Sequence, residues 1–213
     1  MAKQLLSGID LADVIISKKN NSKQSNFLIV CLLFFVMFKP GFAQAEISKH
    51  HQIMAGLLLH LTSFTQWPDM KEETVNLCIV GDDPFKQYIN SMVKRRSTNR
   101  SGQAIVILRA SNYTTATIRA CHMVYINSNQ MLHLWEILPT DHHILLVGED
   151  ENFIDQGGMV NFVRDNTKVK LEVNLTAVLN AKLKLSSTLL KHAKIITDAP
   201  SRSAFEENNN ESK

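Results

Sequence analysis

The chain has 213 residues and a formal net charge of +3, with 23 Lys and Arg against 20 Asp and Glu. Five of these cations and two of the acids lie in the first 45 residues, so the remaining 168 residues carry 18 of each and are formally neutral. A neutral globular part gives no support for nucleic-acid binding. Its length suits one domain with a full core. One local basic cluster, Lys94, Arg95, Arg96 and Arg100, is expected to be a solvated loop after a helix.

An uninterrupted apolar segment of twelve residues occupies positions 27–38. It is shorter than the roughly 20 residues that a membrane-spanning helix needs. Lysines precede it, and Ala43-Gln44-Ala45 after it has the small-x-small pattern of a cleavage site. Residues 1–45 are therefore predicted to be a secretory signal peptide with an extended n-region, cleaved between Ala45 and Glu46. A buried core helix or an uncleaved anchor is the alternative.

The rest of the chain alternates between helical and strand patterns. Apolar residues recur at helical spacing over 48–66, and Trp67-Pro68 ends that pattern because the residue before proline disfavours the helical conformation. Short β-favouring runs then alternate with amphipathic segments. The predicted strands are 75–80, 104–108, 122–126 and 144–147, and the predicted helices between them are 84–94, 112–119 and 128–138.

The pattern changes near residue 159. Segments 159–163 and 168–173 are separated by four residues and predict a hairpin. Asn174 can cap a final helix that breaks near 185–187 and restarts through Ile196, and the polar composition of 197–213 predicts a disordered tail. The predicted fold of the single domain, 46–196, is an α/β three-layer sandwich. Its mostly parallel sheet has the flavodoxin-like order 2-1-3-4, with a C-terminal antiparallel hairpin and C-terminal helices.

The first predicted strand runs into Gly81-Asp82-Asp83-Pro84. Gly81 can take a positive φ there, and Asp82 or Asp83 can cap the following helix. If the first three strands have the spatial order 2-1-3, a ligand would bind at the C-terminal ends of strands one and three. This places Gly81, Asp82, Asp83, Asn127 and Ser128 around a candidate crevice. Plain turn and capping roles are the alternative for the same residues.

The sequence shows no catalytic or metal-ligating constellation. His50-His51 and His142-His143 are adjacent pairs whose side chains are expected to diverge, so neither predicts a chelate. Gly157-Gly158 lacks the third glycine of a phosphate loop and predicts a turn before a strand. The acidic run Glu149-Asp150-Glu151 is expected to begin a short helix. Neither enzymatic activity nor a cofactor is predicted.

Several segments together resemble the YfiR family. Trp67-Pro68 is similar to the family's Phe-x-x-Trp-Pro ending, and residues 77–85 to its Leu-Cys-hydrophobic-Gly-Asp-Asp-Pro-Phe block. Residues 120–126 resemble its Cys-His strand, and Phe153 with residues 157–162 resembles its Phe…Gly-Gly-Met-Ile-x-Phe block. The resemblance covers about 48–196. It departs where His60-Leu61 replaces a frequent Asn-Phe, and where a second cysteine pair of some members is missing.

The resemblance implies a periplasmic regulator that is not an enzyme. The best-understood type in the family binds the periplasmic part of a membrane-bound diguanylate cyclase and inhibits it, which lowers cyclic-di-GMP and biofilm formation. A homodimer is also expected from the resemblance. Related domains serve other envelope signalling proteins, so a periplasmic small-molecule sensor that uses the strand-end crevice is the alternative. An exported enzyme on a flavodoxin-like scaffold is a third, weaker hypothesis.

Two cysteines remain after Cys31 is removed with the leader, and the resemblance implies that they form the family's disulfide. Cys78 lies in the middle of the first predicted strand, and Cys121 opens the third. Strands that neighbour each other are about 4.8 Å apart, which is within the usual Cα separation of a disulfide. Export permits the bond. Two buried reduced thiols are the rival interpretation.

Overall fold

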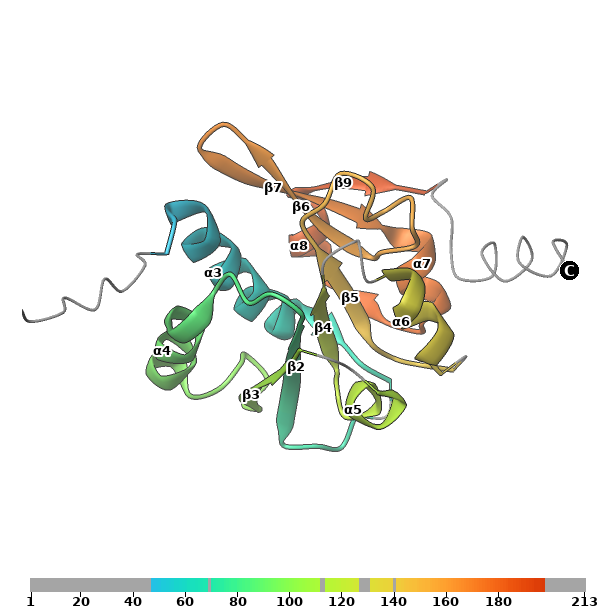
Figure 1. Cartoon of the computed structure of the whole chain (residues 1–213), viewed down its shortest axis with the longest axis horizontal. Helices are drawn as coiled ribbons and strands as arrows, with labels where there is room; N and C mark the ends of the chain where they lie inside the picture. The colour runs from blue at the N-terminus through green and yellow to red at the C-terminus, as the bar shows by residue number, and fades with distance from the viewer. Residues whose placement is uncertain (1–46, 69, 112–113, 127–130, 140, 198–213) are drawn as a thin grey trace, which may run out of the picture. The chain divides into compact units, whose positions relative to one another are not determined.

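The computed structural model describes residues 47–197, apart from 69, 112–113, 127–130 and 140 (Figure 1). The predicted signal peptide, the cleavage site between Ala45 and Glu46, and all but the first residue of the predicted tail lie outside the described residues. Asn127 and Ser128 of the candidate crevice also lie outside them. Of the helices within the described ranges, none combines the length and the apolar character needed to cross a bilayer.

The helices begin where capping side chains satisfy their first backbone N–H groups. Ser48 accepts from the backbone of His51, Thr114 from that of Thr117, and Asn174 from that of Ala177. The described helices are α3 (Lys49–Phe64), α4 (Lys86–Arg96), α5 (Thr115–Arg119), α6 (Met131–Ile137), α7 (Leu175–Asn180) and α8 (Ser187–Leu190). Asn174 is thus confirmed as the predicted cap.

The described strands are β1 (Thr65–Gln66), β2 (Thr74–Val80), β3 (Ala104–Ala110), β4 (Met123–Ile126), β5 (Leu145–Gly148), β6 (Val160–Asp165), β7 (Lys168–Asn174), β8 (Lys184–Leu185) and β9 (Ala193–Ile196). Seven of them form one sheet in the order β3-β2-β4-β5-β6-β7-β9. Neighbours from β3 to β6 are parallel, and β6 pairs with β7 as an antiparallel hairpin. The predicted order of the first four strands and the hairpin are confirmed.

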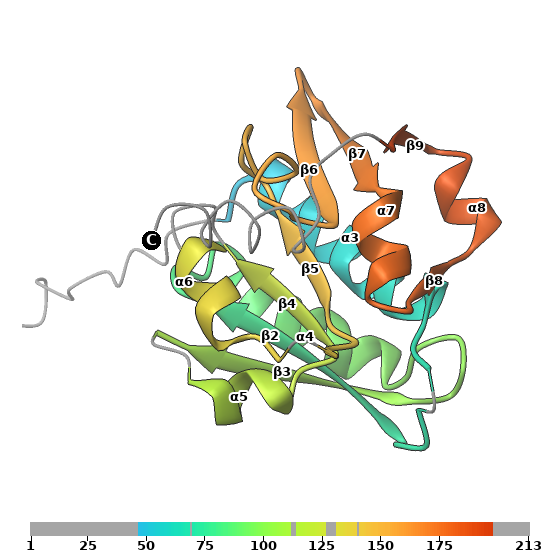
Figure 2. The ribbon, with the colours of Figure 1, turned by 90° about the vertical axis from the view of Figure 1, so that its right-hand side faces the viewer.

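Helices cover both faces of this sheet (Figures 1 and 2). The connection β2–α4–β3 runs toward one edge, whereas β3–α5–β4 and β4–α6–β5 run back. Because such crossovers are right-handed, α4 lies on one face and α5 and α6 on the other. α3 packs beside α4 and buries Met54, Leu58 and Leu59 completely. β4 and β5 are buried at every position, as expected of parallel strands covered on both sides.

The predicted C-terminal helix through Ile196 is wrong after residue 181. The chain forms β8, then the single turn α8, which Ser186 caps, and then β9, which pairs in parallel with β7. Sheet pairing beyond β7 therefore overrides the helical spacing of Leu189, Leu190, Ala193 and Ile196. The predicted helix at Glu149-Asp150-Glu151 is also wrong, because residues 151–157 form a series of turns instead.

A second, two-stranded sheet holds the end of α3. β1 pairs antiparallel with β8, with Thr65 opposite Leu185 and Gln66 opposite Lys184. The helix ends at Phe64, two residues earlier than the pattern predicts, because the next two residues pair with another strand. This pairing anchors the segment that leads to Trp67.

Candidate functional site

At the carboxyl edge of the sheet, Asp83 organises the loop after β2. Its Oδ1 accepts hydrogen bonds from the backbone N–H groups of Phe85 and Lys86, at 2.8 and 2.9 Å. Its Oδ2 lies 2.7 Å from Nε of Arg109, which comes from β3. Gly81 has φ +79° and its N–H donates to the carbonyl of Ala110. Asp83 therefore caps the backbone before α4, and Gly81 forms the turn after β2. A ligand crevice at this edge stays a prediction.

A second polar group at the same edge was missed by sequence reasoning. Tyr125 of β4 is 3% exposed, and its hydroxyl donates to Oε1 of Glu149, which follows β5. Burial and the Glu149 carboxylate raise the pKa of Tyr125 far above its usual range, so the hydroxyl stays protonated. Alternation along a short strand could not reveal this bond, because its partner lies 24 residues away.

The two adjacent histidines of α3 meet this Glu149 instead of diverging. Nε2 of His50 and Nε2 of His51 lie 3.8 and 3.9 Å from the same oxygen, Oε2 of Glu149. Burial lowers the pKa of His50, and the guanidinium of Arg164 adds to this, whereas Glu149 opposes it. The expectation that neighbouring histidines point apart is therefore wrong here. Within the described ranges, no group of three His, Cys, Asp or Glu is placed to hold a metal ion.

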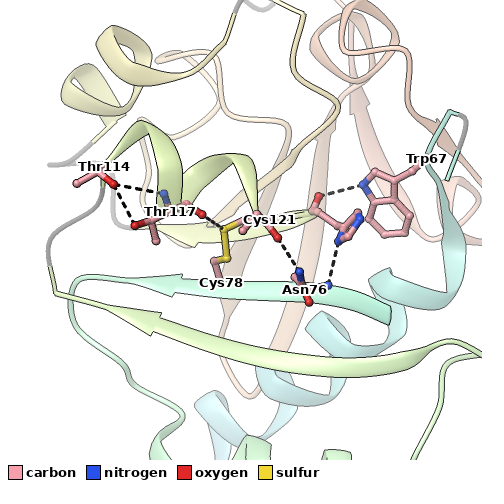
Figure 3. Close-up of a disulfide and its surroundings, with 8 residues drawn as sticks. Trp67, Asn76, Cys78, Thr114, Thr117 and Cys121 are labelled. Atoms are coloured by element: carbon pink, nitrogen blue, oxygen red, sulfur yellow. Dashed lines mark hydrogen bonds between the residues drawn. A yellow bond between two sulfur atoms is a disulfide. The ribbon is translucent and has the colours of Figure 1, made fainter. Parts of the chain in front are cut away.

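At the amino edge of the sheet, Cys78 and Cys121 form the predicted disulfide (Figure 3). Their Cα atoms are 5.9 Å apart, and the two residues are 2% and 4% exposed. The bond joins the middle of β2 to the loop that enters β4, and these two strands are neighbours in the sheet. It therefore fixes α5 and this loop against the core.

Near the disulfide, Trp67 (Figure 3) and His122 connect three segments of the chain. The indole N–H of Trp67 donates to the carbonyl of His122 at 2.9 Å. The backbone N–H of Asn76 donates to Nδ1 of His122 at 3.0 Å, and the Asn76 amide donates to the carbonyl of Ala120 at 2.7 Å. Since Nδ1 accepts a hydrogen bond, the proton of neutral His122 is on Nε2. Burial lowers the pKa of His122, against the opposing effect of Glu72.

A pocket of about 270 Å³ opens at this amino edge. Three loops that lead into β2, β4 and β5 line the pocket. They contribute the indole ring of Trp67, several polar and charged side chains, and Cys121 of the disulfide. The lining residues are Trp67, Pro68, Met70, Glu72, Arg119, Cys121, His122, Pro139, Asp141, His142, His143 and Ile144. The pocket lies at the opposite edge of the sheet from the crevice that the strand-end rule predicts.

Two of the pocket histidines have opposite hydrogen-bonding roles. His122 holds its proton on Nε2, whereas Nδ1 of His143 lies 2.9 Å from the carbonyl of Ala181 and must donate to it. When this ring is neutral, its Nε2 is an acceptor. A ligand in the pocket would meet imidazole groups of both kinds as well as the carboxylates of Glu72 and Asp141.

These features define a disulfide-linked α/β sandwich domain with a small pocket at the amino edge of its sheet. The sequence matches the YfiR/HmsC-like family (DUF4154) over residues 51–194, and the chain belongs to this family. Members of the family are periplasmic regulators of diguanylate cyclase systems. No curated protein matches the chain.

Among solved structures, the chain is similar to the ABC domain in complex with L-Trp from Streptococcus pneumonia. The identity is 11% and the TM-score 0.41, and the match covers 68% of this chain. The chain spans 60% of the length of that protein. This likeness is too distant to bear on function.

Proposed function

We propose that this protein is a periplasmic repressor that binds the periplasmic part of a membrane-bound diguanylate cyclase. Repression would lower cyclic-di-GMP and biofilm formation. The observation that carries the proposal is membership of the YfiR/HmsC-like family over nearly the whole described domain. The Cys78–Cys121 bond supports it, because a structural disulfide is typical of an oxidising compartment such as the periplasm.

The decisive experiment deletes the gene in its host and measures cyclic-di-GMP, with complementation by the intact gene. The level should rise on deletion and return on complementation, and the cyclase should co-purify with the exported protein. An unchanged level after deletion contradicts the repressor function. A variant complementing gene without the export segment 1–45 is the matched control, since a protein that acts in the periplasm needs export to complement.

The second candidate function is a periplasmic small-molecule sensor that serves another envelope signalling system. The pocket beside Trp67 and His122 favours it, because its volume of about 270 Å³ suits a small ligand and its lining combines apolar walls with donors and acceptors. Native mass spectrometry of protein purified from the periplasm would detect a retained ligand. Met70→Trp, which fills the pocket, should abolish the retained mass, and a ligand that survives this change is bound elsewhere.

A further inference from the structure

Four cations gather at the end of the domain where α3 and α4 finish. Lys94, Arg95 and Arg96 form the last turn of α4, and Arg100 lies in the loop before β3. All four side chains belong to exposed residues. Because Ala104 of β3 pairs with Thr74 at the start of β2, this loop lies at the amino edge of the sheet. These four residues are called the basic end below.

Two rings of α3 hold two of the three arginines of the basic end, Arg96 and Arg100, in place. His60 and Phe64 stack with their planes inclined by 14° and their centroids 6.1 Å apart. The guanidinium of Arg96 donates to Nε2 of His60 at 3.2 Å, and that of Arg100 lies 5.2 Å from the centroid of the Phe64 ring. Burial lowers the pKa of His60, and Arg96 and Arg100 lower it further, so the ring accepts from Arg96 as a neutral group.

The loop that presents Arg100 is held rigidly against α3. Asn99 is 8% exposed and its amide donates to the carbonyl of Thr62 at 3.1 Å and to the side chain of Gln103 at 2.9 Å. Its side-chain oxygen accepts from the backbone of Ser101 and of Gln103, both at 3.0 Å. The turn also needs a positive φ of 62° at Ser97, a conformation unfavourable for a residue other than glycine. The backbone is thus locally strained at Ser97, in the turn that places Arg100 over α3.

The basic end has no carboxylate partner in the part of the chain that the structure describes. The ion pairs there involve Arg109, Lys170, Lys194 and histidines, and none includes the four cations. Cations at the end of α4 favour its helix dipole, but such an effect decays within the last turn and does not require Arg100. Glu72 and Glu73 lie at the border of this surface, on the side of β2. Their backbone carbonyls accept hydrogen bonds from the side chain of Gln103 and from the backbone N–H of Ala104.

We propose that the basic end is a docking surface for anionic phospholipid headgroups, which places the domain against a membrane. Guanidinium groups match the geometry of phosphate oxygens, and fixed arginines lose little freedom when they bind.

The surface suits a lipid better than an acidic protein segment. Protein interfaces depend on a central apolar or aromatic anchor in a desolvated pocket. The exposed large apolar residues of the described chain are Ile53, Val106, Leu179 and Ile195, and none of them lies on α4 or in the loop 97–103. The ring of Phe64 is covered by Arg100 itself. Clustered cations can bind anionic headgroups without such an anchor.

The test measures co-sedimentation of protein, purified after export, with phosphatidylglycerol-containing and with pure phosphatidylcholine vesicles. The wild type should co-sediment with the phosphatidylglycerol-containing vesicles and not with the pure phosphatidylcholine vesicles. Salt at 1 M should release it, because the Debye length falls from about 10 Å to about 3 Å. Each cation near an anionic surface contributes about fivefold to the binding constant. The variant Lys94→Gln/Arg95→Gln removes two exposed cations that form no ion pair within the described residues, and it should weaken binding about 25-fold.

The matched control is Lys49→Gln/Lys168→Gln, which removes two exposed lysines at the opposite edge. It should bind within about twofold of the wild type. Equal binding to both vesicle types, or an equal loss in the two double variants, overturns the proposal. Competition by millimolar inorganic phosphate would also overturn it, since it would indicate a discrete anion site.

The vesicle assay contains no cyclase, so its outcome is separate from that of the gene deletion. If Lys94→Gln/Arg95→Gln leaves vesicle binding unchanged but abolishes complementation in the host, the basic end binds an acidic protein. That result contradicts the lipid proposal and leaves the repressor function intact. Loss of vesicle binding with normal complementation supports the lipid surface while showing that repression does not depend on it.

Discussion

Gly158 lies directly against the ring of Phe153. A Cβ atom added to Gly158 would overlap Cδ1 and Cε1 of that ring, and one added to Gly148 would overlap its other edge. Phe153 is completely buried, and its carbonyl accepts from the N–H of Gly158 at 2.9 Å. Two glycines thus form a slot for one phenyl ring, which gives a physical reason for the spacing of phenylalanine and glycines in this part of the sequence.

Gly158→Ala should destabilise the fold by about 1–3 kcal/mol, because the added methyl group collides with a ring that has no room to move. Urea unfolding followed by circular dichroism measures the loss. Gly56→Ala is the control, since its Cβ would meet only Met92 Cε at an ordinary 3.7 Å, and alanine favours a helix by up to about 1 kcal/mol. A Gly158→Ala protein as stable as Gly56→Ala would show that the slot is not tight.

The double variant Cys78→Ala/Cys121→Ala should lose up to about 4 kcal/mol of stability, because the bond closes a loop with a sequence separation of 43. Reduction of the wild type should give a loss of similar size. Alkylation of the unfolded protein without reductant, followed by intact-mass measurement, should add no label at these two positions. Two labels there would mean free thiols and would contradict the bond.

Stability should fall as the pH decreases below about 6.5, in part through His122. The pKa of His122 is lowered in the folded state, so below the ordinary value the unfolded chain binds a proton that the folded chain does not. Protonation of Nδ1 would also break the bond from the backbone of Asn76. His50 and His60 act in the same direction.

The test measures the free energy of unfolding between pH 7.5 and 5 for the wild type, for His122→Gln and for His192→Gln. The His192 variant is the control, because that residue is exposed. The dependence on pH should be shallower in His122→Gln and unchanged in His192→Gln. A steeper loss in His122→Gln than in the wild type would reverse the predicted sign.

Asp83→Ala should cost about 1–2 kcal/mol of stability, because two backbone N–H groups at the start of α4 lose their acceptor. Asp83→Asn keeps an oxygen for the cap but removes the charge that faces Arg109, so its loss should be smaller. Thermal unfolding of both variants, and of each combined with Arg109→Gln, separates the cap from the ion pair. Equal losses in the two variants would assign the whole effect to the charge.

The alternation of strand and helix patterns allowed a mostly parallel sheet to be predicted, and the order 2-1-3-4 of its first four strands was expected by analogy with flavodoxin-like sheets. The sequence pattern did not reveal β9, since Ala193 to Ile196 also fit a helical pattern and only the exposed edge of β7 makes them a strand. The disulfide was implied by the family resemblance, and the neighbouring positions of the first and third predicted strands were consistent with it. The pocket was not predicted, because Trp67 and His122 lie 55 residues apart and meet through a backbone carbonyl.

The position of β9 constrains how the protein can be made. Residues 193–196 form this strand and pair with β7 at the edge of the main sheet. The sheet is therefore complete only after nearly the whole domain has been synthesised. Until then β7 presents an unpaired edge, which is a template for aggregation. The main sheet therefore lacks its edge strand until these residues are synthesised, and a chain cut just before residue 193 should be recognised by quality-control proteases.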